Sequence, residues 1–283
     1  MLVASRSLLF GCDHHIQNPE SGSRRIPTTF PQKDGETIYV HPDALGNFIV
    51  NYLPKLKFKF VLLSGDSDTT VPNDIINEAN YLLGHPLLIC WYSQNCITVV
   101  DKLRQLPIGL DFHTLERGAY SWGPQQSLSS QHQDILNLQN LKIPKLSKCY
   151  ANFQFLMNTR YAQDRIDAIN QIPNGLVFYE PMKTTRINCW NNMLKYKYVI
   201  SPHGNGLDCH RTWEALLCGC IPIMRSSVFN ELFEGLPVLI VEKWSDISLQ
   251  LLVTTLADFK DKHDKNELKY EKLELAYYTK MFS

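Results

Sequence analysis

Residues 196–224, YKYVISPHGNGLDCHRTWEALLCGCIPIM, predict the fold of the second half of the chain. The β-branched and aromatic run at 198–200 is followed by Ser-Pro, which is typical of the end of a strand. Asp208 is expected to cap a helix with apolar residues at helical spacing, and Gly219 is expected to end it before a second strand at 221–223. The stretch therefore predicts a strand–loop–helix–strand unit, as in parallel α/β sheets.

Polar side chains are concentrated in this unit, between residues 201 and 214. A helix N-terminus presents backbone N–H groups and the positive end of its dipole, so it suits a phosphate. Arg211 adds a planar, permanently charged fork for phosphate oxygens, and Glu214, one turn further on, is placed to accept hydrogen bonds from a ribose. Most strand–loop–helix units bind nothing, and an ordinary glycine turn would explain the loop alone. The density of polar groups favours a nucleotide-sugar site: Ser201, His203, Asn205, Asp208, His210, Arg211 and Glu214.

Two strings, SPHGNGLDCHRTWEALLCGCIPI at 201–223 and LPVLIVEKWSDIS at 236–248, resemble the C-terminal half of exostosin-like glycosyltransferases. The resemblance is strongest over residues 149–250. It implies an inverting glycosyltransferase of α/β class with the GT-B fold, in which two Rossmann-like domains face a central cleft and a C-terminal helix crosses back. It also implies a UDP-sugar as donor and a glycan hydroxyl as acceptor.

The first half contains LSGDSDTTVP at 63–72 and LPIGLDFHTL at 106–115, which resemble short exostosin-like proteins of large algal viruses. On this resemblance alone we expect UDP-xylose as the donor and a role in viral capsid N-glycan synthesis. Host cytoplasm is then the expected site of action. The N-terminal residues make a poor signal peptide, and no apolar run is long enough to span a bilayer, unlike the membrane-anchored animal exostosins.

Composition narrows the class of protein. Hydrophobic residues at 44% and charged residues at 20% describe a soluble globular chain. Lysine plus arginine number 28 and aspartate plus glutamate number 28, so the net charge of zero argues against broad nucleic-acid binding. The eight cysteines form no compact framework and are expected to be free thiols. The histidines and acids near residue 208 match no zinc spacing, so neither a metal site nor a cofactor besides the UDP-sugar co-substrate is expected.

At 283 residues the chain is long enough for two domains. A stretch rich in Ser, Gln and Gly at 116–148 is the expected boundary. We therefore expect an acceptor-binding Rossmann-like domain at 1–145 and a nucleotide-sugar-binding one, with the terminal helix, at 146–283. Predicted strands are 8–12, 37–41, 58–64, 87–92, 106–110, 150–155, 176–179, 198–200, 221–223 and 238–241; predicted helices are 43–53, 73–83, 161–171, 185–195 and 247–259.

Two arginines open the first helix of the second half. Arg160 follows a strand-to-loop turn, where an open α/β sheet binds its ligands, and is expected to share the diphosphate with Arg211. Arg165 either joins them or is a solvated charge on a polar helix face. The predicted nucleotide-sugar site comprises Arg160, Arg165, Ser201, His203, Gly204, Asn205, Gly206, Arg211 and Glu214.

An inverting transfer needs a base that takes the proton of the attacking hydroxyl. Asp13 follows the first predicted strand and is the preferred candidate, because loops after the first strand often carry the base in GT-B enzymes. Asp111 and His113 also follow a predicted strand and remain candidates. For each aspartate the alternative is a structural role, since Asp commonly caps the turn after a strand.

Asp66 and Asp68 form a D-x-D pattern after an apolar strand. GT-A glycosyltransferases use such a pair to hold Mn²⁺ against a nucleotide diphosphate, so a metal-dependent GT-A enzyme is one rival hypothesis. Because the predicted diphosphate site already has arginines, we instead expect these acids, with His14, to bind the acceptor. A non-catalytic glycan- or nucleotide-binding protein is the other rival.

Overall fold

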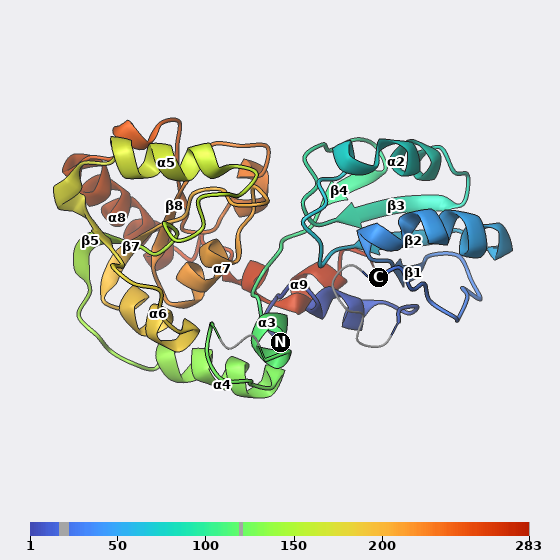
Figure 1. The fold of residues 1–283 in the computed structure, drawn as a ribbon, viewed down its shortest axis with the longest axis horizontal. Coiled ribbons are helices and arrows are strands. Elements are labelled where there is room, and N and C mark those ends of the chain that lie inside the picture. The colour runs from blue at the N-terminus through green and yellow to red at the C-terminus, as the bar shows by residue number, and fades with distance from the viewer. Residues whose placement is uncertain (17–22, 119–120, 283) are drawn as a thin grey trace. The chain divides into compact units, whose positions relative to one another are not determined.

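A computed structural model describes residues 1–16, 23–118 and 121–282 and divides the chain into two compact units. The first unit comprises Met1–Ile108 with Glu274–Ser283, and the second comprises Gly109–Leu273. The division therefore falls at residue 109 rather than at 146, and the last residues return to the first unit. Each unit is built on one sheet whose strands are all parallel, as expected for an α/β protein (Figure 1).

Among the described residues of the first unit, the sheet has its strands in chain order: β1 (Glu36–Tyr39), β2 (Phe60–Ser64), β3 (Leu88–Ser93) and β4 (Leu103–Gln105). Alternate side chains such as Ile38, Leu62 and Trp91 pack in one apolar cluster with the helices that connect the strands. The predicted helix 43–53 is a succession of short turns, namely a 3-10 turn (Pro42–Ala44), α1 (Leu45–Asn47), a π-helical turn (Phe48–Tyr52) and a 3-10 turn (Leu53–Lys55). The predicted helix 73–83 is a 3-10 turn followed by α2 (Ile76–Leu83).

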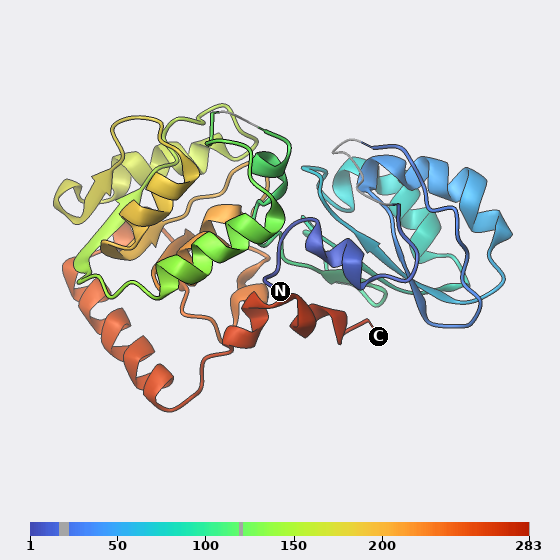
Figure 2. The ribbon, with the colours of Figure 1, turned by 90° about the horizontal axis from the view of Figure 1, so that it is seen from below.

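The opposite face of this sheet carries the two ends of the chain. The expected strand at 8–12 is wrong: Ser7–Gly11 forms a 3-10 helix, in which Leu8 and Leu9 are both buried. Strand alternation would turn one of these neighbours outward, whereas a helical turn lets both pack. The Ser7 hydroxyl supports the turn by bonding the backbone of Ala4. Helix α9 (Leu275–Thr279) lies beside it (Figures 1 and 2).

In the part of the second unit that the structure describes, the sheet has the order β6-β5-β7-β8-β9: β5 (Leu146–Ala151), β6 (Val177–Tyr179), β7 (Tyr196–Ile200), β8 (Ile221–Arg225) and β9 (Leu239–Val241). The chain starts inside the sheet, moves to one edge with β6, and then returns past β5 to β7. The direction of winding thus reverses between β5 and β7. In open α/β sheets this reversal opens a crevice at the carboxyl ends of the two strands, where ligands bind.

Helices cover both faces of the second sheet (Figure 1). Helices α5 (Ala162–Gln171) and α8 (Leu249–Asp264) pack on one face, in a cluster with the buried Trp244. Helices α4 (Leu128–Gln139), α6 (Arg186–Met193) and α7 (His210–Leu217) lie on the other. Because α4 packs on α6 and Gln139 donates to the carbonyl of Leu217, the segment after residue 108, with its short helix α3 (His113–Glu116), belongs to this unit.

Three further properties concern the described residues only. All eight cysteines are free thiols, as the sequence predicts, and six of them are buried. None of the described helices is long and apolar enough to cross a membrane. Over the same residues, no group of three or more histidine, cysteine or acidic side chains is arranged to hold a metal ion.

Candidate functional site

Two loops follow β5 and β7 at the point where the winding of the second sheet reverses, and they are bonded to each other. The backbone N–H of Tyr161 donates to the carbonyl of Gly204 at 3.0 Å, and the N–H of Arg160 donates to Oδ1 of Asn205 at 3.3 Å. The structure thus brings together residues from 160 and from 204–206, which the sequence predicts for one site. Arg160 and Asn205 are exposed there, whereas Gly204 is buried.

Helices α5 and α7 both begin at these loops, and neither has a side chain that caps its first turn. The N-cap of α7 is Cys209, so the expectation that Asp208 caps it is wrong. The Asp208 carboxylate is buried and instead accepts a hydrogen bond from Nε1 of Trp213 at 2.8 Å. The positive ends of two helix dipoles therefore converge on adjacent loops.

Arg211, in the first turn of α7, is held against the loop that follows β5. Its Nε donates to Oδ1 of Asn152 at 3.1 Å, and Nη1 donates to the carbonyl of Pro202 at 3.4 Å. The guanidinium carbon lies 5.6 Å from the centre of the Phe153 ring. These contacts fix the orientation of a half-buried side chain. The sequence does not predict Asn152 and Phe153 as loop residues of the site, because it predicts a strand at 150–155, whereas β5 ends at Ala151.

Arg165 is a buried side chain, only 4% exposed, and not a solvated charge. Its Nε donates to the carbonyl of His203 at 3.0 Å, and Nη1 donates to the carbonyl of Leu156. Burial lowers the pKa of Arg165 to about 10, and the charge of Arg211 contributes to the decrease, so the side chain stays protonated at neutral pH. The buried Arg165 therefore links the loop after β5, through Leu156, to the loop after β7, through His203.

Asp164, the neighbour of Arg165, serves the same loops and was not predicted. Its carboxylate accepts hydrogen bonds from the backbone N–H of His203 at 2.9 Å, from Nε1 of Trp244 at 2.8 Å and from Nη1 of Arg225 at 3.1 Å. A signal was present in the sequence: Asp164 precedes Ala168 by one helical turn, so both lie on the buried face of α5.

His203 is buried, with Nδ1 3.3 Å from Oδ2 of Asp164. Its Nε2 has no hydrogen-bond partner among the residues that the structure describes. Burial lowers the pKa of His203 and outweighs the opposing effect of the Asp164 charge. The imidazole is therefore neutral at neutral pH.

Ser201, Gly206 and Glu214, the other residues predicted around α7, each make a different contact. The Ser201 hydroxyl is buried and hydrogen-bonds the Thr212 hydroxyl at 2.8 Å, which ties β7 to α7. The carbonyl of Gly206 accepts the N–H of Gly204 at 2.9 Å and closes the loop. Glu214 lies one turn beyond Arg211 on α7, with Oε1 3.8 Å from Nε of Arg186.

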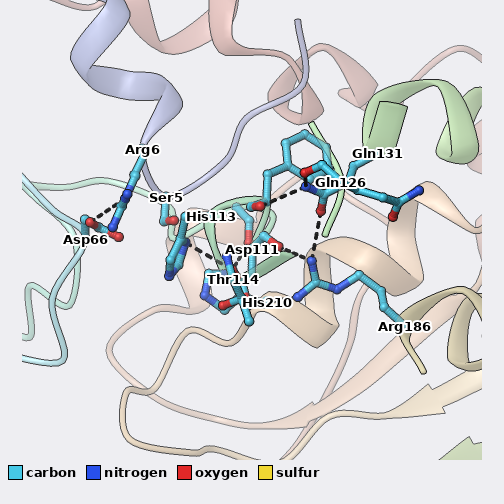
Figure 3. Close-up of polar contacts among 12 residues, drawn as sticks. Ser5, Arg6, Asp66, Asp111, His113, Thr114, Gln126, Gln131, Arg186 and His210 are labelled. Atoms are coloured by element: carbon cyan, nitrogen blue, oxygen red, sulfur yellow. Dashed lines mark hydrogen bonds and ion pairs between the residues drawn. The ribbon is translucent and has the colours of Figure 1, made fainter. Parts of the chain in front are cut away.

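Asp111 and His113, expected in the first domain, belong to the second unit. The Asp111 carboxylate accepts hydrogen bonds from the backbone N–H of Thr114 at 3.0 Å and from Nη2 of Arg186 at 2.9 Å, and it lies 3.0 Å from Nδ1 of His113 (Figure 3). Burial acts to raise the pKa of Asp111, but the nearby charges of His210, His113 and Arg186 outweigh it and lower the pKa. This carboxylate is ionised and already paired.

Asp13 and His14 lie beside β1 in the first unit. Asp13 does not follow a strand, because the preceding residues are helical; its Oδ2 accepts from the Thr37 N–H at 2.9 Å and from the Thr37 hydroxyl at 2.8 Å. Burial acts to raise the pKa of Asp13, but these hydrogen bonds outweigh it and lower the pKa. The ring nitrogens of the buried His14 lie 2.9 Å from the Thr29 hydroxyl and 3.0 Å from Oε2 of Glu36.

Asp66 and Asp68 follow β2 at the carboxyl edge of the first sheet. Asp66 is buried, has a left-handed backbone with φ of 62°, and accepts a hydrogen bond from Nε of Arg6 at 2.6 Å (Figure 3). Its backbone N–H donates to Oε1 of Gln94 at 2.7 Å. Asp68 is exposed. The Asp66 carboxylate is therefore paired with Arg6, whereas Asp68 is exposed to solvent.

No family model and no curated protein matches the chain. Among solved structures, the chain is similar to one described as trehalose-6-phosphate from E. coli bound with UDP-2-fluoro glucose, with 12% identity over 88% of this chain and 72% of that chain and a TM-score of 0.42. It is also similar to an OtsA apo structure, with 11% identity over 87% of this chain and 71% of that chain and a TM-score of 0.41.

Proposed function

We propose that the second unit binds a nucleoside-diphosphate sugar and that the protein transfers the sugar to a hydroxyl group. One observation carries the proposal: two helices whose N-cap residues make no side-chain cap begin at adjacent loops where the sheet reverses its winding, with Arg160 in one of these loops and Arg211 in the first turn of α7. Backbone N–H groups, helix dipoles and guanidinium groups together favour a diphosphate. The GT-B fold and the exostosin-like family belong to the proposal, since they rest on resemblance.

The proposed reaction inverts the anomeric carbon. The acceptor oxygen forms a bond to this carbon from the face opposite the diphosphate, the bond from the carbon to the phosphate oxygen breaks, and the acceptor proton passes to a base. Negative charge grows on the departing diphosphate, so Arg211 and the helix N-termini stabilise the transition state more than the bound substrate. Asn152 and Phe153 keep the Arg211 guanidinium in place for this role.

The base is proposed to be Asp13. Its carboxylate is exposed and ionised at neutral pH, as a proton acceptor must be. Asp111 is less suited, because Arg186 and the Thr114 N–H already occupy its carboxylate, and His113 lies against the same group. Asp68, Asp66 and His14 remain the proposed acceptor-binding residues; Asp68 is the most accessible of the three.

UDP-xylose as donor, a viral capsid glycan as acceptor and a cytoplasmic site of action are proposals that come from the sequence alone. A metal-dependent GT-A reaction at Asp66 and Asp68 remains the rival enzyme. The ion pair between Asp66 and Arg6 disfavours this rival, because Mn²⁺ would have to compete with the Arg6 guanidinium for the Asp66 carboxylate. The proposed nucleotide site itself needs no metal ion to balance the diphosphate charge.

The test is thermal unfolding in EDTA with UDP and a panel of UDP-sugars. A ligand at 100 times its dissociation constant adds about 2.7 kcal/mol to the free energy of unfolding, which shifts the midpoint measurably. We expect the shift in the wild type and in Arg104→Ala, which removes an arginine of the first unit, and its loss in Arg211→Ala. Transfer activity should be lost with it while the unliganded midpoint is kept.

Other outcomes would favour one of the rival hypotheses or overturn the proposed site. A shift that appears only after Mn²⁺ is added would favour the GT-A hypothesis. A shift with UDP but no transfer to any glycan acceptor would favour a non-catalytic binding protein. Full activity of a folded Arg211→Ala variant would overturn the proposed diphosphate site.

A further inference from the structure

Arg186, the first residue of α6, is 5% exposed, and its guanidinium is held on two sides. Nη2 donates to Oδ2 of Asp111 at 2.9 Å, and Nη1 donates to Oε1 of Gln131 at 3.1 Å and to the carbonyl of Asp111 (Figure 3). These bonds fix the plane of the guanidinium. Two N–H groups remain, one on Nη2 and one on Nε, and Nε lies 3.8 Å from Oε1 of Glu214.

Glu214 is a nearly buried carboxylate, with 13% of its side chain exposed. Among the residues that the structure describes, Arg186 is its one partner within ion-pair distance. Because 3.8 Å is longer than a hydrogen bond, this charge attraction leaves the lone pairs of the carboxylate available to other donors. The charge of Arg186 is shared with the closer Asp111, so the cluster of these three side chains keeps a net negative charge.

The position of Glu214 limits the part of a ligand that it can bind. Arg211 and Glu214 are three residues apart on α7, so they are neighbours on one face of the helix. A carboxylate accepts hydrogen bonds and repels phosphates. A ligand whose diphosphate is held at Arg211 therefore meets Glu214 with a neutral, hydroxyl-bearing group. A vicinal diol fits best, because its two hydroxyls can donate to the two carboxylate oxygens.

We propose that Arg186 is a positioning residue, which holds the Glu214 carboxylate in the orientation that accepts both hydroxyls of a ribose cis-diol. The inference rests on the proposed nucleotide site. It adds that Glu214, positioned by Arg186, gives this site its preference for a ribose. Arg186 does not touch the ligand; its bonds to Asp111 and Gln131 make its position rigid, and the fixed charge restricts Glu214. The segment that contains Asp111 and Gln131 thereby contributes to nucleotide recognition.

The test compares equilibrium binding of UDP and of 2′,3′-dideoxy-UDP by titration calorimetry. Removal of Arg186 alone would take the guanidinium away from the largely buried Asp111 carboxylate, and breaking such an ion pair destabilises a fold. The test therefore uses the double variant Arg186→Gln/Asp111→Asn, in which two neutral amides replace the ion pair. We expect UDP to bind about ten-fold more weakly to this variant, the equivalent of one hydrogen bond to a charged group. Binding of the dideoxy nucleotide should be unchanged, because it makes no bond to Glu214.

The controls separate this inference from the proposed function. The Glu214→Gln variant should lose the preference for UDP over 2′,3′-dideoxy-UDP, and the Arg104→Gln variant should keep this preference. An equal loss of affinity for both nucleotides in the double variant would show that Arg186 acts on the fold and would overturn the inference. Equal binding of both nucleotides by the wild type would also overturn it, while the diphosphate site would stand. Binding of neither by the wild type would overturn the proposed function itself.

Discussion

Gly204 is needed for space and not for a left-handed backbone. A Cβ atom at this position would lie 2.7 Å from Nη2 of Arg165 and 3.4 Å from Sγ of Cys209. Arg165 has no room to withdraw, because it is buried and bonded to the carbonyls of His203 and Leu156. The glycine therefore lets the loop after β7 lie directly on a buried guanidinium.

We expect Gly204→Ala to lower the free energy of unfolding by about 1–3 kcal/mol, since overpacking forces a shift of side chain or backbone. Urea unfolding, followed by circular dichroism, measures the change. Gly175→Ala is the matched control: it lies in the same unit, and its added Cβ would meet no atom within 4 Å. Equal stability of the two variants would show that the loop can move away from Arg165.

His203 links stability to pH. Its pKa is lowered by burial from the ordinary value of 6.5, so the unfolded chain binds a proton more readily than the folded one. Stability is therefore complete above about pH 6.5 and decreases as the pH falls below it, by at most about 1.4 kcal/mol per pH unit. We expect His203→Gln to reduce this slope between about pH 6.5 and about pH 5.

The measurement is urea unfolding of the wild type and the variant at several pH values. His263→Gln, which changes an exposed histidine in the last turn of α8, should keep the wild-type slope. A slope that persists in His203→Gln would mean that other groups bind the protons.

The sequence predicts Arg160 and Arg211 as residues of one site, because each belongs to a recognisable strand–loop–helix unit; that assignment stays a prediction. The burial of Arg165 could not be predicted in the same way. A charged side chain enters the interior only where hydrogen-bond partners meet it, and its partners are carbonyls from two loops, 9 and 38 residues away in sequence.

The helices of the second unit begin in two different ways. Helix α8 has a side-chain cap: the Ser248 hydroxyl accepts a hydrogen bond from the N–H of Leu251 at 3.1 Å. Helices α5 and α7, whose first turns lie at the proposed diphosphate site, have none. Helix α6 also begins without a side-chain cap, so the missing cap is not confined to the helices at the proposed site.

We expect Ser248→Ala to lower the free energy of unfolding by about 1 kcal/mol, the typical contribution of an N-cap. Ser248→Asp should retain stability, because a carboxylate accepts the same hydrogen bond and also interacts favourably with the helix dipole. Urea unfolding measures both variants. A loss of similar size in both would contradict a capping role.

The C-terminal segment completes the first unit. The N–H of Leu275 donates to the carbonyl of Met1 at 2.9 Å, and the Tyr92 hydroxyl donates to the carbonyl of Met281 at 3.0 Å. The Phe282 ring, 4% exposed, lies 5.8 Å from the Tyr92 ring. The sheet face that α9 and the N-terminal helical turn cover would otherwise expose apolar side chains to water.

We expect Phe282→Ala to destabilise the first unit by roughly 3–5 kcal/mol, the usual cost of removing a buried phenylalanine. Limited proteolysis with mass spectrometry should then show faster cleavage within residues 23–108 and unchanged protection of residues 146–273. Met281→Ala is the control in the same segment, since the Met281 side chain is 45% exposed. Unchanged cleavage in Phe282→Ala would show that the segment contributes little.

The sequence by itself determines the alternation of strands and helices, the parallel sheets and the polar loop after β7. These features follow from the spacing of apolar residues and from local turn residues, which act over a few positions. Only the tertiary structure decides that the segment from residue 109 joins the second unit, that Glu274–Ser283 returns to the first, and that Arg165 and Arg186 are buried. Each of these depends on surfaces and hydrogen-bond partners that are distant in the chain and come together only on folding.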